Sequence, residues 1–245
     1  MALLGPSIVP AFLLGGAIVW LVALAMGELC VELPREGSFV SFAKELVSSP
    51  WAAGVGWSYW LNWCAYIACE MIAGGIIMHS FVPAVPAMAW TVAFGVLITG
   101  INLLNVAAFG AIESALAVVK IAAVALFAAL GAGVWLGVAG GGGFLGTTVL
   151  TGGQGLAGLF PAGGPAVLLS MVVVLVNFQG TELIALAASE TKDPREAVPR
   201  ACRQVALRII GIFVVPLLIL VAIFPHAQST LEESVFSAAL ASHGF

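Results

Sequence analysis

Residues 177–199 read NFQGTELIALAASETKDPREAVP, a hydrophobic segment that polar residues interrupt. An uncharged apolar run over 165–176 leads into it, so Gly180, Thr181 and Glu182 fall in the middle of a hydrophobic stretch. A hydroxyl and a carboxylate are costly in lipid, and they persist there when they line a cavity or bind a ligand. The segment therefore predicts a site within a membrane, of the kind that serves transport.

A helix broken near Gly180 would suit such a site. Glycine weakens a helix, and the side chains of Asn177, Gln179 and Thr181 can satisfy or replace backbone hydrogen bonds. Many carriers bind their ligand at a broken helix, where free N–H groups meet a carboxylate and free carbonyls meet a cation. We expect Phe178 to close over the ligand as an apolar lid. The alternative is a continuous helix with Gly180 at a packing contact.

The composition excludes a water-soluble globule. Of the 245 residues, 62% are hydrophobic and 8% are charged, whereas a soluble domain carries about 25% charged residues. The mean hydropathy is +1.14. No basic tract suggests a nucleic-acid partner. The four cysteines form no C-x-x-C pair, so neither a disulfide framework nor a metal site is predicted.

Six segments are long and apolar enough to cross the hydrocarbon core, which takes about 20 residues of helix. They cover roughly 8–31, 53–80, 87–108, 112–137, 166–189 and 205–225. The Lys and Arg residues outside these spans or at their edges fall in two loops, 32–51 and 190–208, which alternation places on one side. The positive-inside rule makes that side cytoplasmic. The predicted fold class is thus an all-α membrane protein with about six transmembrane helices.

Both ends of the chain then lie on the outer side of the membrane. The chain enters its first span directly after an uncharged turn, Gly5-Pro6-Ser7, and ends inside another outer segment. Carriers of the bacterial type more often keep both ends inside. We therefore expect residues 1–245 to form a single transmembrane domain that is incomplete, with one helix missing before it and others missing after it.

Charged residues inside the spans supply further candidate sites. Glu70 lies deep in the second span, where a carboxylate suggests function, although it could instead make a structural hydrogen bond to a neighbouring helix. Glu113 and Lys120 lie seven residues apart in the fourth span, close to two helical turns, so both point to a similar face. Both are candidates for coupling or gating. Lys120 either carries a charge that changes during a transport cycle or pairs with a carboxylate.

Residues 33–50 mix apolar and charged side chains between the first two spans. Phe39, Phe42, Ala43 and Leu46 recur there at helical spacing. We expect an amphipathic helix at the cytoplasmic interface, either as a plain surface helix or as a moving part of an inner gate.

Four stretches resemble the amino acid permease family of the amino acid–polyamine–organocation superfamily. GELCVELPREGSF over 27–39 is similar to the second helix of that family and its following loop, and GWSYWLNWCAYIACEMIAGG over 56–75 to the third helix. NVAAFGAIESALAVVKI over 105–121 resembles the fifth helix. FQGTELIALAASETKDPREAVPRACRQVALRI over 178–209 resembles the sixth helix, the next loop and the start of the seventh helix. The motifs occur in the family's order, and the resemblance covers nearly the whole chain.

The resemblance implies a leucine-transporter-like bundle, with two five-helix inverted repeats and extra helices, about twelve spans in all. This chain would hold the family's helices two to seven. It would lack the first helix, whose unwound segment in the family binds the substrate opposite the sixth helix.

The matching positions also imply roles for single residues. A substrate-contact role carries over to four residues of the interrupted segment: Phe178, Gly180, Thr181 and Glu182. Glu70 would face the substrate pocket from the third helix. Lys120 would stand near the missing first helix, where a cation can replace a sodium ion, and this favours proton coupling.

The predicted function is therefore secondary active transport of amino acids across the inner (cytoplasmic) membrane, coupled to protons, by a fragment of a permease. Amino acids, protons and the lipid bilayer are the expected partners, without nucleic acid or cofactor. Glu70 or Glu182 would be protonated or paired during the cycle. An enzyme is not expected, because the sequence holds no H-E-x-x-H, no G-x-S-x-G and no paired aspartates. The alternative is a non-transporting membrane subunit that assembles with another polypeptide supplying the missing helices.

Overall fold

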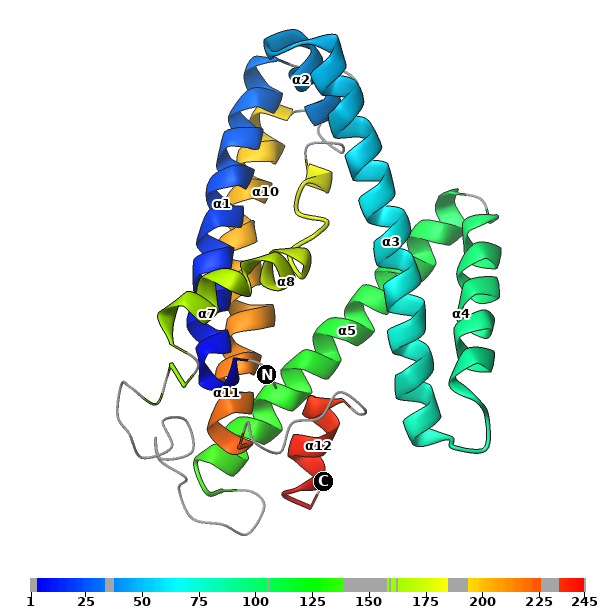
Figure 1. Ribbon diagram of the computed structural model, residues 1–245, viewed down its shortest axis with the longest axis vertical. Helices are drawn as coiled ribbons and strands as arrows, with labels where there is room; N and C mark the ends of the chain where they lie inside the picture. The colour runs from blue at the N-terminus through cyan, green and yellow to red at the C-terminus, as the bar shows by residue number, and fades with distance from the viewer. Residues whose placement is uncertain are drawn as a thin grey trace. The chain divides into compact units, whose positions relative to one another are not determined.

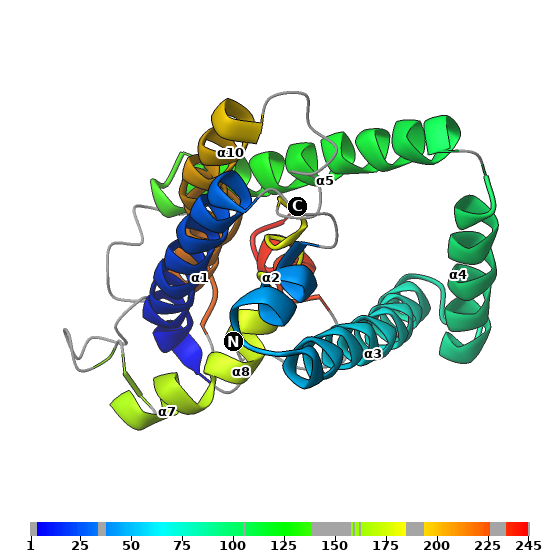
Figure 2. The same ribbon diagram turned by 90° about the horizontal axis from the view of Figure 1, so that it is seen from above.

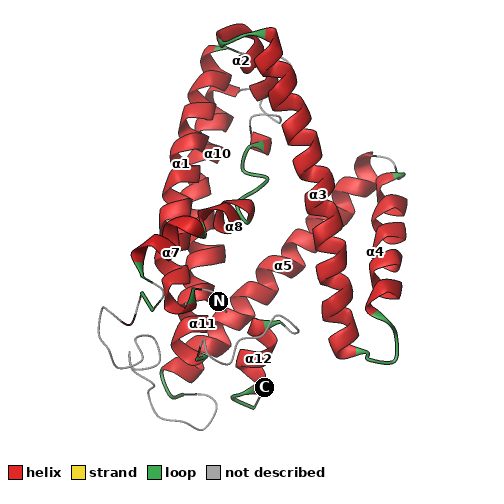
Figure 3. Cartoon of the chain, in the orientation of Figure 1, coloured by secondary structure: helices red, strands yellow, loops and turns green. Residues whose placement is uncertain are grey.

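A computed structural model describes residues 4–33, 38–104, 106–138, 158, 160–161, 163–184, 194–225 and 234–244. Every regular element in these ranges is helical, as Figure 3 shows. The chain divides into two compact units. Unit 1 comprises Met1–Gly5, Trp63–Leu159 and Leu218–Phe245, and unit 2 comprises Pro6–Asn62 and Phe160–Leu217.

The helices can be followed along the chain in Figure 1. In order they are η1 (Gly5–Ser7), α1 (Ile8–Glu32), α2 (Ser38–Leu46), α3 (Ser49–Phe81), α4 (Ala87–Asn102), α5 (Val106–Trp135), α7 (Gly164–Leu169), α8 (Met171–Val176), α10 (Pro194–Arg208), η3 (Ile209–Val214), α11 (Val215–Ile223) and α12 (Val235–Ala241).

Within the described ranges, four helical stretches are long and apolar enough to cross a membrane: Gly5–Glu32, Ser49–Phe81, Ala108–Trp135 and Arg195–Ile223. They correspond to four of the six predicted spans. The predicted span 87–108 is instead a shorter apolar helix, Ala87–Asn102, and the predicted span 166–189 begins as the short apolar stretch Gly164–Val176. The all-α membrane fold class is confirmed, and the described residues hold four full-length helices where six spans were predicted. Residues 185–189 of the predicted span 166–189 lie outside the described residues.

Many outward side chains of these helices are large and apolar. Trp57 of α3 is 70% exposed, Val96 of α4 is 69% exposed and Val118 of α5 is 67% exposed. In water, each such side chain would forgo the roughly 1.5–3 kcal/mol that burial contributes. Lipid removes that cost, so the exposed faces suit a multi-pass membrane protein.

In unit 2, α1 runs antiparallel to α10 and packs along it, as Figures 1 and 2 show. Two glycines of α1 allow this close approach. A Cβ atom on Gly16 would lie 2.6 Å from Cγ2 of Ile209, and one on Gly27 would lie 2.8 Å from Sγ of Cys202. Neither distance leaves room for a methyl group, so these glycines set the spacing of the two helices.

The amphipathic helix predicted over 33–50 is α2. Phe42 is 4% exposed and packs in a core cluster with Cys30 and Cys202. Leu46 on the same helix is 57% exposed. The inward face of α2 therefore holds it against α1 and α10 within unit 2.

In unit 1, the second half of α3 packs against α4. A Cβ atom on Gly75 would collide with the side chain of Thr91, so glycine is what lets these helices meet. Helices α5 and α11 meet in the same way, because a Cβ atom on Gly131 of α5 would collide with Ile219 of α11.

The helix that begins as α10 continues into α11 through η3, which is a π-helical turn. There the N–H group of Val215 bonds the carbonyl of Ile210, five residues back. Pro216 follows at once and supplies a reason, because it lacks an N–H group and its ring would press on the carbonyl four residues earlier in a regular α-helix. A π turn widens the helix at that point and relieves both problems.

Candidate functional site

The interruption predicted near Gly180 is present in the structure. Helix α8 ends at Val176, and residues 177–182 form consecutive turns before a short helical return at 183–184. The φ angle of Gly180 is +96°, a left-handed conformation that glycine adopts without the strain of a Cβ atom. An α-helix cannot pass through such a residue, so the alternative of a continuous helix is wrong.

Local hydrogen bonds hold the broken segment together. The N–H groups of Asn177 and Phe178 bond carbonyls three residues back, which tightens the end of α8. The Asn177 side-chain amide donates to the Val173 carbonyl at 2.8 Å, and the Thr181 hydroxyl donates to the Phe178 carbonyl at 3.1 Å. These two side chains therefore satisfy backbone groups, as the sequence predicted.

Gln179 behaves differently from its neighbours. Its side-chain oxygen Oε1 is buried and has no hydrogen-bond partner among the residues that the structure describes. A buried acceptor without a donor loses its interaction with water and gains nothing in return. An N–H group of a suitable partner would satisfy this atom.

The Glu182 side chain folds back over its own turn. Its oxygen Oε2 accepts the backbone N–H of Gly180 at 2.9 Å, and Oε1 accepts the hydroxyl of Tyr59 at 3.2 Å. Tyr59 lies on α3, where its ring makes an edge contact with Phe39 of α2 at a centroid distance of 4.9 Å. Glu182 thereby joins the broken segment to α3 within unit 2.

Phe178 lies in an aromatic cluster. The ring is 3% exposed and sits 5.5 Å from the ring of Phe12 on α1 and 5.1 Å from that of Phe213 on η3, centroid to centroid. We predicted a lid over a ligand, and that role stays a prediction, since the ring in this conformation is packed among protein side chains.

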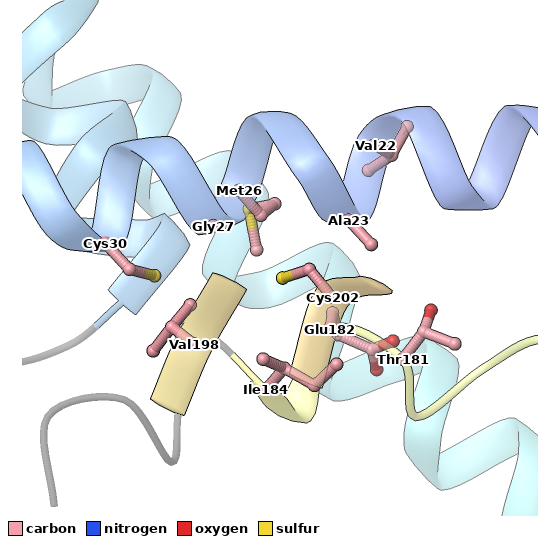
Figure 4. A pocket seen from close by; sticks show the side chains of 10 residues that line it. All are labelled: Val22, Ala23, Met26, Gly27, Cys30, Thr181, Glu182, Ile184, Val198 and Cys202. Carbon is pink, nitrogen blue, oxygen red and sulfur yellow. The ribbon is translucent and has the colours of Figure 1, made fainter. Parts of the chain in front are cut away.

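Thr181 and Glu182 line a small cavity in unit 2, drawn in Figure 4. Its volume is about 30 Å³, the space that roughly one water molecule occupies in the liquid. The other walls come mainly from α1 and α10 and are apolar or carry sulfur: Val22, Ala23, Met26, Cys30, Val198 and Cys202. An amino acid has several more non-hydrogen atoms than a water, so this conformation of the cavity is closed to it.

Glu70 belongs to unit 1, in the half of α3 that follows Trp63. Its side chain is exposed and is hydrogen-bonded by Tyr66, one helical turn earlier. This partner lies on the same helix, whereas the structural alternative from the sequence was a bond to a neighbouring helix.

Glu113 and Lys120 also belong to unit 1 and are exposed on α5. Within the part of the chain that the structure describes, neither side chain forms an ion pair. The four predicted contact residues at 178–182 are thus brought together in unit 2, while Glu70, Glu113 and Lys120 lie in the other unit.

Two participants were missed by sequence reasoning. Tyr59 stands in the W-S-Y-W-L-N-W run, but nothing in the run shows that its partner lies 123 residues further along. Phe213 sits in an apolar run and resembles any lipid-facing phenylalanine. Pro216, three residues later, was a signal that the helix around Phe213 would be irregular.

Comparison with known proteins gives one family. The family model described as amino acid permease matches residues 1–244. No solved structure matches the chain.

Curated relatives carry the same description. The amino-acid permease RocC of Bacillus subtilis is 35% identical over 232 residues, which cover 95% of this chain and 49% of the relative. The gamma-aminobutyric acid permease of Bacillus subtilis is 35% identical over 237 residues, 96% of this chain and 50% of the relative. The lysine-specific permease LysP of Escherichia coli is 32% identical over 223 residues, 90% of this chain and 45% of the relative. The chain therefore spans about half the length of these relatives.

Proposed function

Because this chain belongs to the amino acid permease family, we propose that it is part of a secondary transporter that carries amino acids across the cytoplasmic membrane together with protons. The observation that supports this most strongly is the broken segment at 177–182, with Glu182 folded over Gly180 beside a cavity lined by α1 and α10. Carriers place their ligand at such breaks, because only there does a membrane helix offer free backbone groups.

The segment suits the ammonium group of an amino acid. Glu182 supplies a carboxylate, and Gln179 supplies a buried side-chain oxygen without a donor among the described residues. An ammonium group has three N–H donors and no acceptor, so either oxygen suits it as a partner. The closed cavity of about 30 Å³ must widen for this, and such opening and closing is what alternating access requires.

Glu182 also offers a route to proton coupling. As a carboxylate it accepts from both Gly180 and Tyr59. A protonated carboxyl group is neutral, so its hydrogen bonds with Gly180 and Tyr59 lose the strength that the negative charge adds. Proton binding would thus weaken both links and loosen the segment. Glu70 is a second candidate, and Lys120 would supply a fixed cation.

We further propose that residues 1–245 act as one transmembrane part of a longer leucine-transporter-like permease in the inner membrane. The match to about half of each relative supports this. The same observation favours a second candidate, a subunit that assembles with a separate polypeptide. Affinity purification of the chain from its own cells separates them: a distinct, stoichiometric membrane polypeptide supports the subunit.

Ligand binding tests the proposal. The chain is reconstituted in lipid nanodiscs, and equilibrium binding of labelled L-lysine, L-phenylalanine and γ-aminobutyrate is measured. We expect saturable binding of at least one of them, weakened about tenfold or more by Glu182→Gln, which removes a charge-assisted contact. Glu196→Gln is the matched control, because Glu196 is 77% exposed and its ion pair with Arg200 is long, at 3.9 Å. Equal affinities of the Glu182→Gln chain and the unaltered chain would contradict the proposed site.

Uptake is a separate measurement. In a strain that lacks amino acid uptake, we expect the chain expressed alone to give no robust uptake, because alternating access would need the rest of the proposed longer permease. Saturable uptake by the chain alone would contradict the proposal that it acts only as part of a longer permease.

A further inference from the structure

Two irregular segments of unit 2 meet although they are distant in sequence. One is the broken segment at 177–182, and the other is the π turn η3 at Ile209–Val214. The ring of Phe213 on η3 packs edge-on against the ring of Phe178, with centroids 5.1 Å apart and planes at 68°. The contact therefore joins Phe178 of the broken segment to the π turn between α10 and α11.

A third ring closes the cluster from α1. Phe12 lies 5.5 Å from Phe178 and 6.0 Å from Phe213, centroid to centroid. Gly15 lies on the same helix, and a Cβ atom there would be only 3.2 Å from Cε2 of Phe178 and 2.9 Å from Cγ1 of Val174. The Phe178 ring is thus enclosed by α1 and η3 and has little space to move.

The backbone of Phe178 is hydrogen-bonded to Thr181, a residue of the cavity wall. Its carbonyl accepts the N–H group of Thr181 at 3.4 Å and the hydroxyl of Thr181 at 3.1 Å. Thr181 lines the cavity next to Glu182. A displacement of the Phe178 backbone would therefore shift the cavity wall at Thr181.

The π turn decides where Phe213 points. It places one more residue in the turn than an α-helix does, which corresponds to a rotation of about 100° between the two registers. In an uninterrupted α-helix, Phe213 would face a different direction and lose its contact with Phe178.

We infer that Phe213 is a positioning residue, whose ring holds Phe178 and through it the ligand-facing turn at Thr181 and Glu182. It touches no ligand itself. The effect of Phe213 on ligand binding rests on the proposed function. Its effect on the shape of the broken segment does not depend on that function. The experiment separates the two by a readout that needs no ligand.

The native Cys202 thiol serves as the reporter, because it lines the same cavity and is 2% exposed. The other cysteines are replaced (Cys30→Ala, Cys64→Ala and Cys69→Ala), and the rate of modification by N-ethylmaleimide is measured in nanodiscs. Phe213→Ala should raise this rate about tenfold, since the broken segment then opens locally more often. Phe213→Leu fills most of the volume without a ring, folds more readily and should raise the rate less, about threefold.

Rescue and control variants distinguish positioning from general loosening. Phe213→Tyr keeps the ring and should restore the parent rate. Ile210→Ala removes an exposed side chain from the same π turn, 49% exposed, and should leave the rate unchanged. Equal modification rates in the parent and in both ring-free variants, Phe213→Leu and Phe213→Ala, overturn the inference.

Binding of labelled L-lysine, L-phenylalanine and γ-aminobutyrate is measured on the same proteins. Faster modification of Cys202 in the ring-free variants, together with weaker binding, supports the positioning role and the proposed function. If modification of Cys202 is faster in the ring-free variants but even the parent binds none of the three, the positioning role is supported. That result counts against the proposed function alone.

Discussion

The Glu182 carboxylate accepts the backbone N–H of Gly180 at 2.9 Å, two residues earlier in the chain. This short link is possible because Gly180 has a φ angle of +96° and turns its N–H toward the side chain that follows. The second carboxylate oxygen is bonded by Tyr59 of α3. One acidic side chain thus closes the turn and anchors it to another helix.

Replacing Gly180 with alanine tests the strained turn. Among the described residues a Cβ atom there meets only Leu183 Cδ1, at 3.8 Å, so space is sufficient and the penalty comes from the backbone conformation. We expect Gly180→Ala to lower the unfolding free energy in detergent by about 1–2 kcal/mol. Gly54→Ala is the control, since no atom of another described element lies within 4 Å of its Cβ position in helix α3. That variant should be neutral or stabilising, and equal losses in both variants would count against the strained turn.

Tyr59→Phe removes one hydroxyl and keeps the ring against Phe39. The Glu182 carboxylate then loses one of the two donors that the described residues supply. This loss should lower the unfolding free energy by about 1.5–3 kcal/mol, as for hydrogen bonds to charged groups. Trp60→Phe alters the neighbouring side chain, 58% exposed, and should change stability by less. If Tyr59→Phe is as stable as the unaltered chain, the link from Glu182 to α3 contributes nothing.

Gln179→Leu should stabilise the fold and impair binding. The buried Oε1 atom has no partner within the described residues, and removing such an acceptor spares a desolvation cost of about 1–3 kcal/mol. The same change deletes an acceptor for the ligand's ammonium group. We expect a higher unfolding free energy together with weaker binding of labelled amino acids. A less stable variant with unchanged binding would show that Gln179 is a structural residue.

Gly27→Ala tests the spacing of α1 and α10. The added methyl group would lie 2.8 Å from Sγ of Cys202, and overpacking of this kind costs about 1–3 kcal/mol. Cys202→Ala removes the obstructing sulfur, so the double variant should lose less stability than the sum of the two single variants, with a coupling of about 0.5–3 kcal/mol. Strict additivity would mean that the two helices adjust freely.

Local chemistry explains what could be predicted from the sequence. The break near Gly180 followed from a glycine and polar side chains within an apolar run, and the inward face of α2 followed from the spacing of Phe39 and Phe42. Both features depend on residues a few positions apart. The roles of Phe178, Gly180, Thr181 and Glu182 in binding, and those of Glu70, Glu113 and Lys120, remain proposals.

Contacts between distant residues could not be predicted. Tyr59 meets Glu182 across 123 positions, and neither residue type indicates the other. The end of α4 was also misplaced, because Leu103 and Leu104 continue the apolar run after the helix ends at Asn102. The hydrophobicity of the sequence does not show where the helix ends, because the end depends on the backbone turn after Asn102.

Ligand protection of the Cys202 thiol tests the account most directly, because that thiol lies in the wall shared with Thr181 and Glu182. In a chain whose other cysteines are replaced by alanine, N-ethylmaleimide modification is measured with increasing L-lysine, L-phenylalanine or γ-aminobutyrate. The account predicts that at least one of them changes the rate in a saturable way, and that Glu182→Gln abolishes the change. If none of the three ligands changes the modification rate, even at the highest concentration tested, the result would contradict the account.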